Sequence, residues 1–143
     1  MHISTKGRYA LRLMIDLAQH NTGENISLRD ISRRQDISVK YLEQIVGVLC
    51  KAGLIKSVRG AQGGYRLVKA PENYTAGEIL RATEGSLAPV SCLENEPNQC
   101  PRAGACHTLP FWQGLHQAVT CYVDSISLAD LVNQQPQAPD FSI

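Results

Sequence analysis

The chain contains 143 residues, of which 43% are hydrophobic and 19% are charged. This composition predicts one globular domain, or a small domain with an oligomerisation element, and excludes a disordered chain. No apolar run approaches the roughly 20 residues that span a bilayer, and the N-terminus lacks the apolar core of a signal peptide, so we expect a cytoplasmic protein.

The net charge of +1 hides an uneven distribution along the chain. Residues 1–70 contain 12 Lys or Arg and 5 Asp or Glu, whereas residues 71–143 contain 2 and 8. A basic half attracts a polyanion, and for a small cytoplasmic protein the usual polyanion is nucleic acid. A solvated charged surface is the alternative, and the local motifs must decide between the two.

The first predicted element is a helix that begins at Ser4 or Thr5 and ends at Asn21-Thr22-Gly23. Apolar residues recur along it at helical spacing, which is typical of a helix with one face in the core. These residues are Ala10, Leu13, Met14, Leu17 and Ala18, and the opposite face carries Lys6, Arg8 and Arg12.

Two more helices follow, joined by the short polar turn Gln35-Asp36. Ser27-Leu28-Arg29-Asp30 resembles a capping box and predicts the start of the first of them, and Ser38 caps the second. In the first, Leu28 and Ile31 are expected to face the core and Arg33 and Arg34 the solvent; in the second, the core-facing residues are Leu42, Ile45, Val46 and Leu49. Two helices joined by a tight turn predict a helix-turn-helix.

The exposed face of the second of these helices suits DNA. Lys40 and Lys51 can neutralise phosphates, Glu43 and Gln44 can pair with base edges, and Gly47 allows close approach to a groove. An ordinary amphipathic surface helix is the alternative.

Two short strands, 54–58 and 65–68, come next, joined by Arg59-Gly60-Ala61-Gln62-Gly63-Gly64. A glycine-rich hairpin directly after a helix-turn-helix is typical of a wing. Arginine is favoured in the minor groove, where the potential is most negative. We therefore predict a winged helix-turn-helix at residues 1–70 that binds double-stranded DNA.

The second half is predicted to contain three helices and a loop. Thr75-Ala76-Gly77-Glu78 resembles a capping box, with a helix ending near Glu84-Gly85, and Ser127 caps a last short helix with Leu128, Leu131 and Val132. Between them a longer helix begins near Thr108 and Pro110 and carries an apolar stripe: Phe111, Leu115, Ala118, Val119, Tyr122 and Val123.

Packing of this stripe on the same helix of a second subunit would give a homodimer with two-fold symmetry, as a palindromic operator requires. Packing on its own winged domain is the alternative. We assign residues 71–133 to this connecting, cysteine-containing and dimerising region and residues 134–143 to a disordered tail.

Cys92, Cys100 and Cys106 are separated by seven and five residues rich in Pro, Gly, Asn and Glu, which cannot form regular structure alone. Structural disulfides are rare in the cytoplasm, and thiolates are preferred ligands of iron–sulfur clusters and zinc. Structural zinc normally uses tighter Cys pairs, so the spacing favours a cluster over the zinc alternative. Cys50 and Cys121 are expected to be small buried hydrophobes. A thiol oxidoreductase would need a Cys-x-x-Cys motif, so we do not expect an enzyme.

Several motifs together resemble one family. They are Ser4-Thr5-Lys6-Gly7-Arg8-Tyr9-Ala10, Tyr41-Leu42-Glu43-Gln44, Val58-Arg59-Gly60 with Gly63-Gly64-Tyr65, and Leu87-Ala88-Pro89-Val90 followed by three cysteines. Over roughly residues 1–133 the chain resembles the Rrf-type winged-helix transcription regulators. The resemblance implies a homodimer that is mainly α with a small β-hairpin, a winged helix-turn-helix in each subunit, a long dimerisation helix and an iron–sulfur cluster. Mapped onto this sequence, it implies DNA contacts at Ser38, Lys40, Tyr41, Glu43, Gln44 and Arg59.

Members of this family respond to different signals, and the resemblance also indicates which signal this protein senses. CymR-like members lack the three cysteines, and NsrR-like members, which respond to nitric oxide, use an acidic ligand where this chain has Arg8. IscR-like members use three cysteines and a later histidine, for which His107 is the candidate here, with Glu94, Glu96 or a residue of the other subunit as rivals. The first cysteine spacing is closer to RirA-like, iron-responsive members. We therefore expect a repressor-type regulator of iron–sulfur assembly genes with a 2Fe-2S cluster favoured over 4Fe-4S, the alternatives being RirA-like, NsrR-like and structural-zinc proteins.

Overall fold

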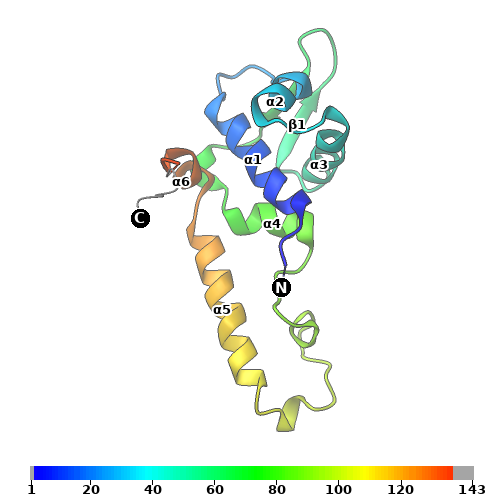
Figure 1. Cartoon of the computed structure of the whole chain (residues 1–143), viewed down its shortest axis with the longest axis vertical. Coiled ribbons are helices and arrows are strands. Elements are labelled where there is room, and N and C mark those ends of the chain that lie inside the picture. The colour runs from blue at the N-terminus through cyan, green and yellow to red at the C-terminus, as the bar shows by residue number, and fades with distance from the viewer. Residues whose placement is uncertain (1, 137–143) are drawn as a thin grey trace, which may run out of the picture.

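The structure is a computed structural model that describes residues 2–136. Its helices are α1 (Thr5–Gln19), α2 (Leu28–Gln35), α3 (Val39–Lys51), α4 (Ala76–Glu84), α5 (Leu109–Ser125) and α6 (Leu128–Asn133), and its strands are β1 (Ile55–Val58) and β2 (Gly64–Leu67) (Figure 1). The two strands form an antiparallel hairpin that pairs Ile55 with Leu67 and Val58 with Gly64. The predicted mainly α fold with a small β-hairpin is confirmed. Most of the predicted tail, residues 137–143, lies outside the described residues.

The helix starts follow from hydroxyl side chains. Each accepts a hydrogen bond from a backbone N–H three residues later, which satisfies a donor that the helix leaves free. The capping residues are Ser4, Ser27, Ser38, Thr75 and Ser127. A complete capping box forms only at the last of these among the described helices. The sequence predicted capping boxes at the starts of α2 and α4, in which Asp30 and Glu78 would bond back to the capping residue. These two carboxylates form ion pairs instead, Asp30 with Arg33 at 2.7 Å and Glu78 with Lys69 at 2.9 Å.

The hydrophobic core surrounds α1, which α2, α3, α4 and α6 all contact. The predicted core residues Leu13, Ile31, Leu42 and Leu49 are fully buried. Residues beyond position 70 complete the same core, chiefly Tyr74, Ile79 and Leu128. The winged module is thus one packed body with α4 and α6, and α5 extends away from this body and meets α4 at its C-terminal end (Figure 1).

A buried ion pair fixes α2 against α1. Asp16 of α1 is fully buried and accepts hydrogen bonds from Arg34 at 2.7 and 3.0 Å and from Gln35 at 3.0 Å. Arg33 and Arg34 are both exposed, as predicted. The guanidinium of Arg34 nevertheless turns back to neutralise this carboxylate, a contact that the sequence did not predict. Burial by itself raises the pKa of Asp16, but the hydrogen bonds from Arg34 and Gln35 and the charge of Arg34 outweigh it and hold the pKa below the ordinary value.

Tyr74 closes the base of the hairpin. Its buried hydroxyl donates to the carbonyl of Leu54 at 2.7 Å and accepts from the backbone N–H groups of Val68 at 2.9 Å and Lys69 at 3.3 Å. Leu54 precedes β1 and Val68 follows β2, so one hydroxyl holds both ends of the wing together. Every polar group involved is satisfied, which removes the cost of burying them.

The end of α4 is held at the start of α1. The Glu84 carboxylate accepts hydrogen bonds from the backbone N–H of Ser4 at 3.0 Å and from its hydroxyl at 2.6 Å. A carboxylate at a helix N-terminus is favourable because of the helix dipole. A Cβ at Gly7 would meet this carboxylate, so a larger residue there would displace Glu84 from its present position. The cysteine loop leaves the body directly after this contact, at Gly85.

The described residues between 88 and 127 include none that is buried. They form an arm in which the cysteine loop runs away from the body and α5 returns toward it (Figure 1). Phe111 and Tyr122 of α5 are 66% and 67% exposed. These two residues of the stripe are therefore not covered by the winged domain, whereas Val123, at the other end of the stripe, lies beside Gly77 of α4. None of the helices between residues 2 and 136 combines the length and the apolar character needed to span a bilayer.

The returning end of α5 is tied to α4. Asp124 forms two hydrogen bonds with Arg81, at 2.7 and 2.9 Å, and Gly77 leaves room for this contact because a Cβ there would meet the Asp124 carboxylate. Thr75 and Ser127 form an isolated β-bridge at the same crossing. The arm thus has a fixed attachment to the body at its α5 end.

Replacing Arg34 should test the buried ion pair. Arg34→Ala leaves the Asp16 carboxylate buried with Gln35 as its remaining donor, so we expect a loss of about 3 kcal/mol in the free energy of unfolding at pH 7. In the wild type the pKa of Asp16 is lower in the folded state than in the unfolded state, where it is about 3.9. This difference adds to the free energy of unfolding in full above the unfolded pKa, and the contribution is lost as the pH falls through the folded pKa. In the variant, protonation relieves the buried charge, so the loss should shrink as the pH falls. Urea unfolding between pH 7 and pH 4 measures this difference.

The matched control for that experiment is Arg33→Ala. Arg33 pairs with Asp30 on the surface, with 73% of its side chain exposed, and should change the free energy of unfolding by less than about 0.5 kcal/mol. Equal losses in the two variants would contradict the account.

Candidate nucleic-acid interface and cysteine loop

The exposed face of α3 carries most of the residues predicted to contact DNA. Ser38, Lys40, Glu43 and Gln44 are exposed, opposite the buried residues of the same helix. Gly47 has open space where a Cβ would lie, so no side chain projects from this position on the exposed face. The geometry suits a helix that enters a major groove, and the individual base and phosphate contacts remain predictions.

Tyr41 has a different environment from its neighbours. It is half-buried and packs edge-on against Tyr9 of α1, with ring centroids 5.7 Å apart and planes at 89°. The guanidinium carbons of Arg12 and Arg8 lie 5.1 and 5.9 Å from the centre of the Tyr9 ring. Tyr41 therefore joins the recognition helix to the first turns of α1. The contact of Tyr9 with Tyr41 was not predicted, since a contact between two helices leaves no local signal in the sequence.

The wing places Arg59 on the surface directly after β1. The N–H of Gly63 donates to the carbonyl of Gly60 at 3.0 Å and closes the tip, and Gly60 has φ +117, a conformation that favours glycine. Arg59 itself is exposed. The predicted wing is present, with its arginine available to a ligand.

The three loop cysteines are free thiols with intermediate exposure. Cys92 lies in the 3-10 turn Ser91–Leu93, and the N–H of Cys100 donates to the Asn98 side chain at 2.8 Å. The Asn98 Nδ2 atom is buried without a hydrogen-bond partner among residues 2–136. The loop is therefore held by local turns, and not by packing against the core.

Cys106 lies at the start of α5, with its Sγ 3.2 Å from the Thr108 hydroxyl. Hydrogen bonds from the side chain and then the backbone of Thr108 lower the pKa of Cys106, with smaller contributions from Leu109 and Arg102. His107 is exposed beside it, and both line the same hollow. A lowered pKa favours the thiolate, which is the form that binds metals.

The metal-ligand prediction names Cys92, Cys100, Cys106 and His107. Within residues 2–136 no three His, Cys, Asp or Glu side chains gather as a group that could hold a metal ion. The residue types fit an iron–sulfur cluster, since thiolates are its usual ligands, but the chain by itself does not bring them to one point. This ligand set remains a prediction.

The remaining thiols differ from each other. Cys50 packs against the core, and burial raises its pKa, as expected of a packing residue. Cys121 is exposed on α5, so the prediction that it is buried is wrong. The burial was predicted from the helix pattern alone, which does not tell whether the helix has a partner within the chain.

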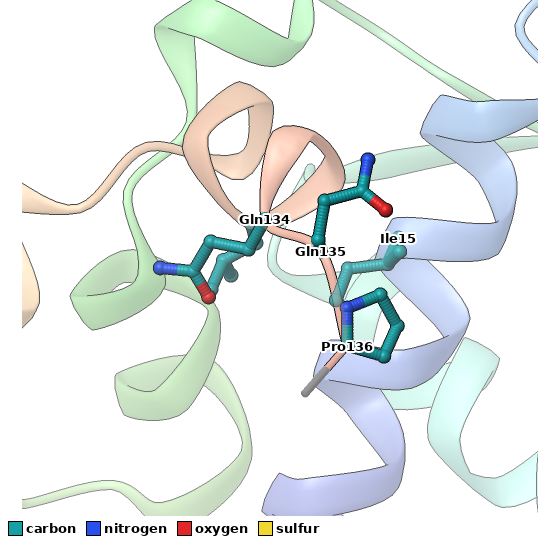
Figure 2. A pocket seen from close by; sticks show the side chains of 5 residues that line it. Ile15, Gln134, Gln135 and Pro136 are labelled. Carbon is teal, nitrogen blue, oxygen red and sulfur yellow. The ribbon is translucent and has the colours of Figure 1, made fainter. Parts of the chain in front are cut away.

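A hollow lies between α1 and the residues after α6 (Figure 2). Its lining side chains are apolar or amides: Ile15, Leu131, Gln134, Gln135 and Pro136. Among residues 2–136 this lining includes no acid, base or nucleophile, so these side chains do not suggest catalysis.

Comparison with known proteins identifies the family. The family model described as "Rrf2: Iron-dependent Transcriptional regulator" matches residues 3–134. The chain belongs to the Rrf2 family. It is 40% identical over 139 residues to the protein named rrf2 of Nitratidesulfovibrio vulgaris, an alignment that covers 97% of this chain and 92% of that protein.

Solved structures agree with the Rrf2 assignment. The structure titled as CymR, the global cysteine regulator of B. subtilis, has a TM-score of 0.75 and 42% identity over 92% of this chain and 96% of that one. The structure of T. potens IscR has a TM-score of 0.74 and 39% identity over 96% of this chain and 94% of that one. The chain is therefore a winged-helix transcriptional regulator that binds DNA, and not an enzyme, as the sequence predicted.

Arg59 provides a test of the Rrf2 wing. Because Arg59 is exposed beside a glycine-rich tip, Arg59→Ala should weaken binding to operator DNA by about 1–3 kcal/mol, the value of one good arginine contact. Titrations at several salt concentrations measure the change. Arg102→Ala removes the same charge from the cysteine loop and serves as the control, with little expected effect. An unchanged affinity for Arg59→Ala would remove this residue from the interface.

Proposed function

We propose that this Rrf2-family protein is a transcription regulator that senses iron–sulfur cluster status through Cys92, Cys100 and Cys106 and controls iron–sulfur assembly genes. Overall similarity does not decide between the two kinds of relative, because identity to CymR and IscR is nearly equal, at 42% and 39%. The observation that carries the proposal is the arm: three free thiols lie on a loop without a core of its own, directly beyond Glu84.

The proposed ligands are the three thiolates and, as the fourth, His107, with a 2Fe-2S cluster favoured. When bound, a cluster supplies redox-active iron whose gain or loss reports iron supply and oxidants. The hydrogen bonds from Thr108 lower the pKa of Cys106 and so favour its thiolate, the form that binds a cluster. The loop contains few contacts that hold it in one conformation, so ligand binding can order it at little cost in lost packing.

The root of the loop contacts the DNA-binding module. Gly85 follows Glu84, whose carboxylate holds the N–H and hydroxyl of Ser4. Ser4 caps α1, and Tyr9, one turn further along α1, packs on Tyr41 of the recognition helix. Ordering of the loop therefore acts on the end of α4 and, through two direct contacts, on the start of α3. A small displacement there is enough to alter DNA contacts.

The proposed active form is a homodimer on a palindromic operator, in the cytoplasm where its DNA lies. Phe111 and Tyr122 of the stripe are exposed, and Asp124, on the side of α5 opposite Tyr122, faces α4 through Arg81. This exposed part of the apolar face is therefore turned away from its own body. A second copy of the same helix would cover it and relate two recognition helices by a two-fold axis.

Replacing the three loop cysteines tests the sensor. Cys92, Cys100 and Cys106 changed together to Ala should remove iron and colour from anaerobically purified protein, while circular dichroism shows an intact fold, because none of the three contributes to the core. The control is Cys121→Ala, which should keep wild-type iron. Zinc in the wild type, together with unfolding of the triple variant, would favour a structural metal site.

The fourth ligand needs a separate variant. His107→Ala should lower cluster content and alter the absorption spectrum if the imidazole is a ligand. Iron, acid-labile sulfide and the spectrum are measured on matched preparations of His107→Ala and His116→Ala. A His107→Ala protein with wild-type values would eliminate this histidine.

The stripe on α5 predicts the oligomeric state. Tyr122→Asp places a charge among apolar side chains and should shift the protein from dimer to monomer in sedimentation velocity experiments. Gln113→Asp adds the same charge to the opposite face of α5 and should leave the dimer intact. A wild-type monomer at all accessible concentrations would contradict the proposed assembly.

A further inference from the structure

A segment before α2 pairs with the wing through one isolated β-bridge. Ile26 and Tyr65 exchange two backbone hydrogen bonds, at 2.9 Å from Ile26 and 2.8 Å from Tyr65. We call residues 23–27 the wing strap. Ser27, at its end, caps α2, so the strap connects the first helix of the helix-turn-helix to the wing.

A glycine in the wing allows the wing strap to approach closely. Gly64 has φ +147, and a Cβ there would collide with the backbone of Ile26. Residues other than glycine rarely adopt this conformation, so both the backbone angle and the close approach require glycine. The strap and β2 thus lie in direct backbone contact.

Asn25 extends the connection to the tip of the wing. Its Nδ2 donates to the carbonyl of Gln62 at 3.2 Å, across 37 positions of sequence. Its Oδ1 is shielded from solvent and has no hydrogen-bond partner within the part of the chain that the structure describes. The side chain spans the hollow between strap and tip, which is lined by Ser27, Asp30 and Gly63 among others.

Arg59 lies on the same short tip. The turn closed by Gly63 and Gly60 separates it from Gln62 by only two residues. Fixing the Gln62 carbonyl therefore restricts the conformations from which Arg59 can reach DNA. Restricting a loop before binding lowers the entropy cost of binding, which raises affinity without a new contact.

We propose that Asn25 is a positioning residue for DNA binding, which acts by holding the wing tip so that Arg59 is presented in its binding conformation. This inference rests on the proposed contact between Arg59 and DNA. It assigns a function in operator binding to a side chain that need not touch the operator.

A double-mutant cycle tests the inference. Asn25→Ala should weaken operator binding about 3- to 10-fold, the range of one neutral hydrogen bond. In an Arg59→Ala background the same change should weaken binding less than about 2-fold, because the group that it positions is gone. Binding is measured by fluorescence anisotropy with the full-length protein. Asn73→Ala, at an exposed asparagine beyond the wing, is the control and should leave affinity unchanged.

Amide hydrogen exchange gives a readout independent of DNA. In Asn25→Ala the N–H of Gly63 should exchange faster, while amides of α1 and α3 keep wild-type rates. If Asn25→Ala does not fold, Asn25→Ser, whose side chain is too short to span the hollow, replaces it in both measurements.

The outcomes separate this inference from the proposed function. If Arg59→Ala weakens binding but Asn25→Ala does not, the positioning role is wrong and the wing contact stands. An equal loss in both backgrounds would also overturn it, because Asn25 would then act independently of Arg59. If Arg59→Ala has no effect, the proposed wing contact itself fails.

Discussion

The buried carboxylate of Asp16 fixes the position of the DNA-binding helices. It is fully enclosed, so it requires the hydrogen bonds from Arg34 and Gln35, and both donors lie in the last turn of α2. That turn leads into α3, so the contact sets where the recognition helix begins relative to α1. The other end of α1 receives the carboxylate of Glu84. Both halves of the chain therefore meet on one helix, which makes α1 the element through which they can influence each other.

The two halves differ in what stabilises them. The winged body has a continuous core to which Tyr74, Ile79 and Leu128 of the second half also contribute, whereas the arm of residues 88–127 has no buried residue. An exposed stripe on α5 and a loop held only by local turns are marginal without a partner or a ligand. This contrast suits a regulator: the rigid part presents the DNA-binding surface, and the part of low stability responds to what it binds.

The sequence predicted the features that depend on local signals. Ser4, Ser38 and Ser127 mark helix starts because a hydroxyl satisfies free N–H groups three residues away, and the wing follows from glycine-rich turn chemistry. Contacts between distant residues were missed. Helical periodicity placed Arg34 on the exposed side of its helix but does not tell that a buried carboxylate lies within its reach, and the contact from Asn25 to the wing joins positions 37 apart. The cysteines identify ligand chemistry, but their spacing alone does not determine whether they meet at one centre.

The central claim is that a cluster on the cysteine loop controls DNA binding by this Rrf2-family protein. The most direct measurement uses protein purified without oxygen, in which iron and acid-labile sulfide are counted and operator affinity is determined before and after the cluster is removed. The account predicts coloured protein with equal amounts of iron and sulfide and an affinity or operator preference that changes on removal. Colourless protein that contains zinc or no metal, and binds the operator equally before and after chelation, would contradict it.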